Sequence, residues 1–372
     1  MSFVILFLKF LPIFLFFIPL YCFVLYPIIL FFLAWLFPSK SLNLTPLLSL
    51  SKVSFLLPAF NEEKFIEKKL KNLSQIAVGK KDVEIIICDD GSTDKTLSLI
   101  KNWIELNSEI KVKLIENTIN QGKWTSLKKM IAVAEGDIIV FSDISAILPL
   151  NFLEKMFSIL NYSDVTVYAP TYSFHENAQK RIWEKIYWPL EKFIRVQESR
   201  WFSTIGAHGA CYALKKIDSI NLDLAETNGV AQINDDFIIP SLSAVNSGKK
   251  IYYDADLEIQ ELETTPVKVE YQRRIRIARG NFLMNKFLLK KISLRMHSKF
   301  YFLVLSHKIL RSYIGPALSI NFLLYSLIQW GDLRYNFIAL IVLCGLLSLS
   351  PIRASVQVFF FDRLIKNQKR WK

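Results

Sequence analysis

Cysteine and histidine are scarce in this chain, which has only four of each among 372 residues. The cysteines (Cys22, Cys88, Cys211 and Cys344) are scattered without paired spacing, and the histidines show no spacing typical of metal ligands. A disulfide framework and a zinc site are therefore excluded, since both depend on such residues at short, regular intervals. Internal repeats are also absent, and the only low-complexity tracts are the apolar ends. The length allows one large domain or two small ones.

Charge is missing from a long stretch at the start of the chain. No charged residue occurs from Phe10 to Phe37, which exceeds the roughly 20 apolar residues that a membrane-spanning helix needs. A signal peptide would instead have an apolar stretch of about 7–15 residues followed by a small-residue cleavage site, and neither fits. We therefore predict a retained membrane segment within residues 1–45. Pro12, Pro19 and Pro27 leave open a kinked helix or a tight hairpin.

Two further uncharged stretches, 312–331 and 335–352, lie near the other end. They predict two more spans within residues 312–372, followed by a basic tail. By the positive-inside rule, the basic clusters on both sides of these spans place the long middle region in the cytosol. We therefore predict a multi-pass protein of the cytoplasmic (inner) membrane. The clusters consist of Lys286, Lys290, Lys291, Arg295 and Lys299 before the spans, and Arg363, Lys366, Lys369, Arg370 and Lys372 after them.

The net charge of +13 does not indicate a nucleic-acid partner. Much of the excess lies in these clusters beside the membrane, and no basic run interleaved with aromatics forms a known nucleic-acid module. Anionic lipid headgroups, or an acidic lipid-linked or phosphate-bearing substrate, explain the charge better. The basic, partly apolar segment 286–311 is typical of an amphipathic helix resting on the bilayer.

The region from Lys52 to Ser145 alternates short apolar runs with helical patterns, which predicts an α/β domain with a mostly parallel central sheet within residues 50–285. Apolar residues recur on one helical face between the runs, as at Ile66, Leu70 and Leu73. We expect Asn61, Ser92 or Thr93, and Gly136 to mark helix ends. Another helix should begin near Asn234 and stop at Gly248, with Pro240 in its first turn. The predicted strands are Val53–Leu57, Val83–Cys88, Val112–Ile115 and Asp137–Phe141.

Acidic residues follow three of these strands and recur once more later in the chain. Because the carboxyl ends of parallel strands meet at one edge, where open α/β sheets bind ligands, we expect the carboxylates to gather there. The segments are Pro58-Ala-Phe-Asn-Glu62, Asp89-Asp-Gly-Ser-Thr-Asp94, Ser142-Asp-Ile-Ser145 and Asn234-Asp-Asp-Phe237.

These motifs, in this order, resemble the family 2 glycosyltransferases of the membrane-bound bacterial type, which have a GT-A fold. Each motif alone is weak, and the ordered set is strong. The resemblance covers roughly Lys52 to Gly280 and includes Asn120-Gln-Gly-Lys123, Gly136-Asp-Ile-Ile-Val-Phe-Ser-Asp143, Gly206-Ala-His-Gly-Ala-Cys-Tyr-Ala213 and Arg274-Ile-Arg-Ile-Ala-Arg-Gly280. It implies transfer of a sugar from a nucleotide donor such as a UDP-sugar.

The resemblance assigns donor binding to the first motifs, namely Pro58, Asn61, Glu62, Asp89 and Asp90. Turn and cap chemistry is the alternative explanation for the Asp89–Asp94 segment. Lys123 follows a glycine at an expected helix start, where its ammonium and the helix dipole favour a phosphate, unless it is a surface lysine.

Asp143 stands where the family has a metal-binding Asp-x-Asp motif. The resemblance therefore implies Mg²⁺ or Mn²⁺ on the diphosphate. Ser145 replaces the second acid, so metal binding rests on Asp143 with diphosphate and water. A plain strand-end turn residue is the alternative for Asp143.

Asp235 and Asp236 match the family's acidic pair, whose second member acts as general base. We expect Asp236 to deprotonate the acceptor and Asp235 to cap the helix or bind a basic partner, while capping by both is the alternative. His208 and Gly209 match an acceptor-side loop.

Arg276 and Arg279 are expected to contact the donor diphosphate or a lipid phosphate, or to form a basic stripe facing the membrane. Ile277 takes the place of a tryptophan that polymer-making members of the family carry.

We therefore expect an inverting glycosyltransferase whose domain faces the cytosol and which extends a lipid-linked or cell-surface glycan, with other proteins of envelope biosynthesis as partners. Two alternatives stay open. The first is a processive polysaccharide synthase, against which Ile277 weighs. The second is a catalytically silent scaffold of a polysaccharide assembly complex, which Ser145 and Ile277 motivate.

Overall fold

The computed structural model describes residues 17–39, 52–80, 82–174, 182–216, 234–262, 267–292, 298–328 and 350–362. It contains two compact units, one between Leu33 and Thr264 and the other formed by the described residues at the two chain ends. Residues 335–349 of the predicted span 335–352 lie outside the described residues, and so does the basic tail from residue 363 onward.

The first half of the Leu33–Thr264 unit is a parallel sheet in the order β3-β2-β1-β4. Its strands are β1 (Val53–Ala59), β2 (Val83–Asp89), β3 (Lys111–Glu116) and β4 (Ile138–Ser142). These are the four strands that the apolar runs predict. Every residue of β2 is buried, as expected for a parallel strand covered on both faces.

The second half makes the sheet mixed, because β6 and β8 pair in parallel whereas β7 and β5 have antiparallel neighbours. The full order is β3-β2-β1-β4-β7-β6-β8-β5, and β7 lies antiparallel to both β4 and β6. Strands and helices still alternate beyond Ser142, but β7 enters the sheet in the opposite direction to β4. The added strands are β5 (Ala146–Ile147), β6 (Val165–Phe174), β7 (Cys211–Lys215) and β8 (Lys250–Glu261).

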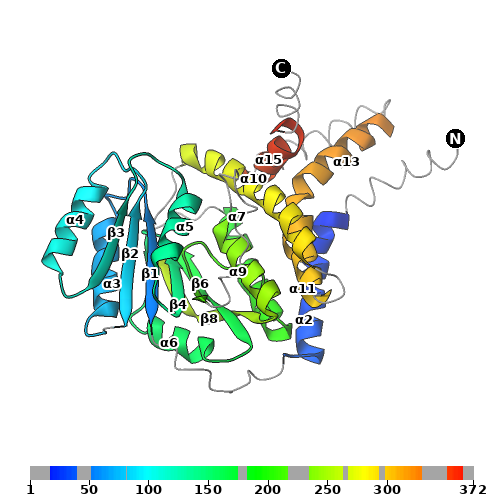
Figure 1. Cartoon of the computed structure of the whole chain (residues 1–372). Helices are drawn as coiled ribbons and strands as arrows, with labels where there is room; N and C mark the ends of the chain where they lie inside the picture. Colours follow the sequence, from blue (N-terminus) through cyan, green and yellow to red (C-terminus); the bar gives the residue numbers. More distant parts are fainter. Residues whose placement is uncertain are drawn as a thin grey trace. The chain divides into compact units, whose positions relative to one another are not determined.

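Helices cover both faces of the parallel part (Figure 1). On one face, α3 (Ile66–Ala77), α4 (Thr96–Leu106) and α6 (Phe152–Leu160) share a core with alternate strand residues such as Phe55. On the other, α5 (Lys123–Val133) packs against β1 and β2. It buries Trp124, Leu127 and Met130.

The helix ends differ from those that local cap signals predict. Helix α3 begins at Ile66, and Asn61 lies in the preceding loop with φ of 57°. Helix α4 begins at Thr96 after Lys95, so Ser92 and Thr93 do not cap it. Helix α5 ends at Val133. The cause is tertiary, because Asn61 Oδ1 instead accepts a hydrogen bond from Thr93 N at 2.9 Å, tying two loops together.

The second half of this unit also contains two helices that contribute predicted site residues or lie beside them. Helix α7 (Ile182–Trp201) is one helix with Pro189 inside it. Helix α9 (Asp235–Ser247) starts and stops as predicted, because Gly248 adopts the left-handed conformation (φ 68°) that glycine permits at a helix end. Pro240 lies inside α9 and not in its first turn.

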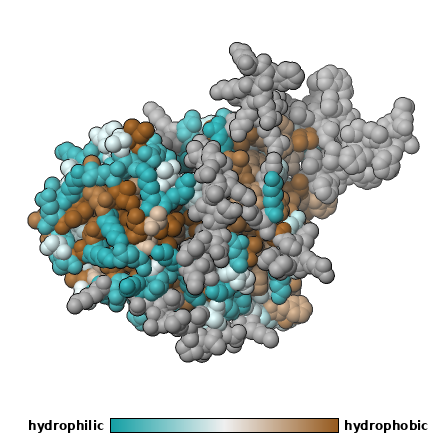
Figure 2. Space-filling model, in the orientation of Figure 1, coloured by the Kyte–Doolittle hydropathy of each residue, from teal (hydrophilic) through white to brown (hydrophobic). Residues whose placement is uncertain are grey.

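The N-terminal apolar segment is one continuous helix from Phe17 to Leu36, the only candidate membrane span among the described residues. It comprises a π-helical turn, η1 (Tyr21–Leu25), and α2 (Tyr26–Leu36). Pro27 lies two residues after the end of η1, and the missing proline N–H accounts for this local widening. A hairpin is therefore absent from this described stretch. Large apolar side chains of α2, including Phe32 and Trp35, are exposed. In Figure 2, hydrophobic (brown) surface is visible where Figure 1 draws α2.

The chain-end unit joins this helix to C-terminal helices. Tyr21 and Ser306 share a hydrogen bond of 2.8 Å between their hydroxyls, and Arg353 lies 4.0 Å from the ring centre of Tyr271. Ile275 on α10 packs in a small core with Ala354. The elements are α10 (Val267–Lys291), α11 (Ser298–Leu303), η3 (Val304–Ile309), α12 (Leu310–Ser312), α13 (Ile314–Ile328), α15 (Ser350–Gln357) and η4 (Val358–Asp362).

Candidate active site

The ends of β1 and β2 form one connected pair of loops. Asp90 N donates to Ala59 O at 2.8 Å, and Asn61 N donates to Ser92 Oγ at 3.0 Å. Glu62 N donates to Thr96 Oγ1 at 2.7 Å. The half-buried Pro58 is a residue of β1. The predicted donor-binding residues at the two strand ends therefore belong to one rigid edge of the sheet.

Asp89 and Asp90 are both buried but have different partners. Asp90 Oδ1 accepts from Gln121 N at 2.9 Å, and its Oδ2 accepts from Gly122 N at 2.8 Å. Its carboxylate thus fixes the loop that precedes Lys123. Asp89 Oδ2 accepts from Ser92 N at 3.1 Å, while Asp89 Oδ1 is buried with no donor among the described residues. A buried acceptor of this kind calls for a ligand, because leaving it unpaired is costly.

Lys123 is the first residue of α5 and links two of the predicted acids. Gly122, at φ 87°, makes the turn into the helix. Lys123 Nζ lies 2.8 Å from Asp143 Oδ1 and 3.3 Å from Asp235 Oδ1. Burial alone would lower the pKa of the Lys123 ammonium, but the nearby carboxylates outweigh it and raise this pKa. Lys123 is therefore a cation held at the acidic cluster and not a free surface lysine.

Asp235 and Asp236 occupy the first turn of α9 but are exposed to different extents. The Asp235 side chain is buried against Tyr212, whose hydroxyl lies 3.4 Å from Asp235 Oδ2. Burial, together with the charges of Asp236 and Asp143, raises the pKa of Asp235 to about 6, although Lys123 acts in the opposite direction. Asp236 is half-buried. The N-cap, Asn234, forms no side-chain cap hydrogen bond.

Gly209 lies between the two remaining carboxylates. A Cβ atom built on it would lie 3.6 Å from Asp236 Oδ2 and 3.8 Å from Asp143 Oδ2. The same loop bonds to both acidic segments, since Ala207 N donates to Asp236 O at 2.6 Å and Asp143 N donates to Ala210 O at 3.0 Å. The structure thus brings Lys123, Asp143, Asp235 and Asp236 into one cluster. Gly209 leaves room for about one methyl group beside Asp143 and Asp236, and we call this room the open position at Gly209.

The donor set fits a divalent cation only if the substrate supplies ligands. Ser145 is buried, which leaves Asp143 as the accessible acid of this loop. Among the described residues, no group of three or more His, Cys, Asp or Glu side chains is arranged to hold a metal ion. One carboxylate combined with phosphate oxygens and water is nevertheless an ordinary Mg²⁺ environment.

Lys69 is a functional residue that sequence reasoning missed. It projects from the apolar face of α3 and is fully buried. Its Nζ donates to Ser142 Oγ at 2.7 Å and to Ala146 O at 2.5 Å, so it clamps both ends of the loop that carries Asp143. Burial lowers the pKa of the Lys69 ammonium to about 8. The sequence signal was a lysine three positions after Ile66, on the side of α3 that packs inward.

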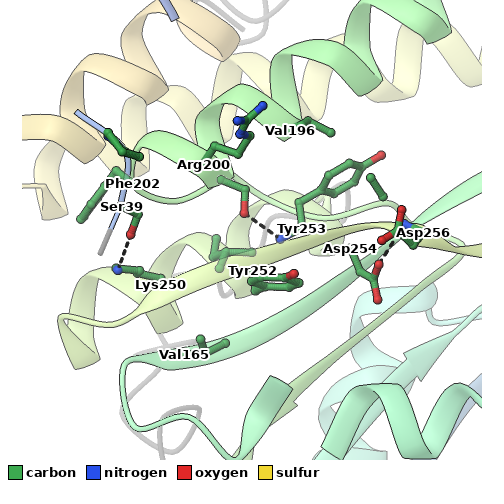
Figure 3. Close-up of a pocket in the computed structure, with 14 residues that line it drawn as sticks. Ser39, Val165, Val196, Arg200, Phe202, Lys250, Tyr252, Tyr253, Asp254 and Asp256 are labelled. Atoms are coloured by element: carbon green, nitrogen blue, oxygen red, sulfur yellow. Dashed lines mark hydrogen bonds between the residues drawn. The ribbon is translucent and has the colours of Figure 1, made fainter. Parts of the chain in front are cut away.

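A separate cavity of about 490 Å³ lies beside β8 and shares no lining residue with the acidic cluster. Lys250 Nζ in its wall donates to Ser39 Oγ at 2.8 Å and lies 3.2 Å from Asp164 Oδ2 (Figure 3). Arg200 and Lys250 are opposed by Asp254 and Asp256 in the lining, so the charge favours neither anions nor cations.

The other predicted residues lie on two different units. His208 precedes Gly209 and is nearly buried within a group of aromatic rings. Arg276 is exposed and Arg279 is half-buried on α10, which belongs to the chain-end unit.

Comparison with known proteins decides the family. Residues 54–219 match the model of glycosyl transferase family 2. This region is a family 2 glycosyltransferase domain. It contains the first three acidic segments, Lys123 and the His208–Gly209 loop.

Curated relatives of this glycosyltransferase domain are distant. Glycosyltransferase GlyA of Streptococcus pneumoniae is 23% identical over 214 residues, which is 54% of this chain and 30% of the relative. The poly(ribitol-phosphate) beta-glucosyltransferase of Bacillus spizizenii is 32% identical over 119 residues, or 31% of this chain and 18% of that protein. The chain thus spans less than a third of the length of either relative.

A solved structure confirms the GT-A-like α/β fold. The mannosyltransferase PcManGT from Pyrobaculum calidifontis, in complex with GDP-Man and Mn²⁺, aligns with a TM-score of 0.71 and 21% identity. The alignment covers 97% of this chain and 99% of that one.

Proposed function

We propose that this glycosyltransferase domain transfers a sugar from a UDP-sugar to a hydroxyl of a lipid-linked or cell-surface glycan, with inversion, at the cytosolic side of the membrane. The observation that carries the proposal is the grouping of Lys123, Asp143 and Asp236 around the open position at Gly209. Sugar transfer needs an anion-binding group, charge neutralisation on the leaving diphosphate and a base, and this cluster holds residue types suited to each.

The ends of β1 and β2 are the best-supported binding site for the nucleoside of the donor. Asp89 Oδ1 is a buried acceptor without a partner among the described residues, and it suits an N–H or hydroxyl of a nucleoside. Asp90 holds the loop before Lys123 through Gly122. Lys123 would then leave its carboxylate partners to contact the diphosphate, where an ammonium at a helix N-terminus favours phosphate.

Asp236 is the proposed base. It is half-buried, and its Oδ2 faces the same open position as Asp143 Oδ2. A single base that deprotonates the acceptor hydroxyl opposite the leaving group gives direct displacement and hence inversion. Asp235, which is paired with Lys123, would position that lysine rather than accept the proton.

Mg²⁺ or Mn²⁺, bound by Asp143 together with the diphosphate, would neutralise charge on the leaving group. The mannosyltransferase of similar fold was solved with Mn²⁺, which supports a cation here. The relative named as a poly(ribitol-phosphate) glucosyltransferase supports an envelope acceptor. The exposed apolar helix Phe17–Leu36 supports attachment to a membrane.

The test is a screen of UDP- and GDP-sugars with the detergent-purified chain, followed by Asp236→Asn. We expect the variant to bind the donor normally but to transfer sugar about 10²–10⁴-fold more slowly, the usual contribution of a general base. Asp256→Asn, at an exposed acid of β8, is the matched control and should keep the wild-type rate. A wild-type rate in Asp236→Asn would exclude the assigned base, and an α/β analysis of the product tests inversion.

A further inference from the structure

Four aromatic rings from four separate segments meet beside the acidic cluster. Tyr172 on β6 lies 4.5 Å from the His208 ring, centre to centre, and 4.9 Å from Trp188 on α7. Trp188 and Tyr253 lie 6.0 Å and 6.1 Å from His208, respectively. We call Tyr172, Trp188, His208 and Tyr253 the aromatic group.

The aromatic group lies next to the reacting centre. His208 is the residue before Gly209, whose Cβ position is 3.6 Å from Asp236 Oδ2 and 3.8 Å from Asp143 Oδ2. The rings therefore begin at the residue next to Gly209, the glycine that lies beside the proposed base. A molecule that offers a hydroxyl to Asp236 has this aromatic wall within reach.

The inner and outer rings of the group differ in exposure. Tyr253 is buried, its hydroxyl donates to Thr171 Oγ1 at 2.8 Å, and Arg195 lies 6.0 Å from its ring centre. Tyr172 and Trp188 are partly exposed instead. Rigid inner rings that support partly exposed outer ones make a preorganised binding face, which costs little entropy to use.

Partly exposed aromatic rings beside a hydroxyl-activating acid suit one class of ligand. The ring face is electron-rich, and the C–H bonds on one side of a pyranose ring present the complementary positive edge. A bare lipid phosphate offers no such face, and it would favour basic rather than aromatic groups.

We propose that Trp188 and Tyr172 form the binding face for a pyranose ring of the acceptor, so that the acceptor already carries a sugar. This rests on the proposed function and narrows its acceptor class. The aromatic face comes from α7 and β6, which are distinct from the position of Ile277, where the polymer-making relatives described above have their tryptophan.

The experiment compares two acceptors, a polyprenyl diphosphate that carries one N-acetylhexosamine and a polyprenyl phosphate without sugar. The variants are Trp188→Leu, which removes the aromatic face, and Trp188→Phe, which retains one. Phe193→Leu changes an exposed aromatic on the same helix and serves as the control. Donor dissociation constants and melting temperatures are measured alongside the acceptor KM.

We expect transfer to the glycosylated lipid only. Trp188→Leu should raise its KM about fivefold to tenfold, the scale of one aromatic contact, with donor affinity and melting temperature unchanged. Trp188→Phe should lie close to the wild type, as should Phe193→Leu. If Trp188 had a purely structural role, Trp188→Leu would instead lower the melting temperature and weaken donor binding.

Equal transfer to the sugar-free lipid, or an unchanged KM in Trp188→Leu, would overturn the inference. Donor binding distinguishes this failure from a failure of the proposed function. A protein that transfers sugar from a UDP-sugar to the glycosylated lipid, with an unchanged acceptor KM in Trp188→Leu, keeps the function and loses the aromatic acceptor site. A protein that binds no nucleotide-sugar loses both.

Discussion

Gly209→Ala should leave the fold intact and weaken donor binding. The added methyl would lie 3.6 Å from Asp236 Oδ2 and 3.8 Å from Asp143 Oδ2, which are ordinary contact distances. Gly209 is not among the glycines with positive φ, so alanine imposes no backbone strain there. Replacing glycine at a compatible position stabilises a protein by about 0.4–1 kcal/mol, so the melting temperature should stay level or rise slightly.

The same methyl occupies the position around which the carboxylates are arranged. A donor that must fit against this methyl would lose binding free energy on the scale of overpacking, about 1–3 kcal/mol, which corresponds to a loss of about 5–150-fold in donor affinity. Calorimetric titration of UDP and UDP-sugars, together with thermal melting, measures both effects. Gly206→Ala gives the contrast, because Gly206 has φ 64° and its added Cβ would lie 3.1 Å from Asp236 O. It should lower the melting temperature. Wild-type donor affinity in Gly209→Ala would refute the placement of the donor at this position.

Two other predictions concern charge. The folded-state pKa of Asp235 is raised to about 6, so its contribution to stability is lost as the pH rises from about 4 through 6. In Asp235→Asn, the free energy of unfolding measured with denaturant should fall less between pH 4 and pH 6 than in the wild type. The same pH dependence in both proteins would contradict the raised pKa of Asp235. Asp90→Asn keeps only one acceptor for the N–H groups of Gln121 and Gly122. It should lower stability by about 1–3 kcal/mol and weaken UDP binding through Lys123, whereas equal melting temperatures would show that Asp90 does not hold this loop.

The parallel half of the fold was predictable because each strand is a buried apolar run. Both faces of β1 and β2 are covered, so their hydrophobicity is continuous and easily recognised. The second half was less predictable, because β7 lies between β4 and β6 and runs antiparallel to both, whereas β6 pairs in parallel with β8. This order depends on contacts between distant segments and not on local periodicity. The predicted helix ends were wrong for a related reason, because Asn61 accepts a hydrogen bond from Thr93 in the neighbouring loop and does not cap its own helix.

The gathering of acids at one edge followed from strand polarity, but their partners did not. Asp143 follows β4, and its place at the edge is dictated by the sheet. The pairing of Lys123 with Asp235 joins the starts of α5 and α9, and this depends on how the second half folds back. Lys69 was overlooked because a lysine in an amphipathic helix is usually solvated, whereas this one replaces an apolar contact with two hydrogen bonds.

The two hydrogen bonds of buried Lys69 restrict which substitutions the loop carrying Asp143 can accept. Ser145 is 4% exposed, and its carbonyl accepts from Leu262 N at 2.9 Å. A single codon change to aspartate at 145 would place an ionised carboxylate in a buried position, which costs several kcal/mol unless a partner is rearranged. The loop is fixed beneath by Lys69, so it cannot easily turn the new side chain outward. A second acid at 145 would therefore need a compensating change nearby, and the loop as it is built favours a single acid.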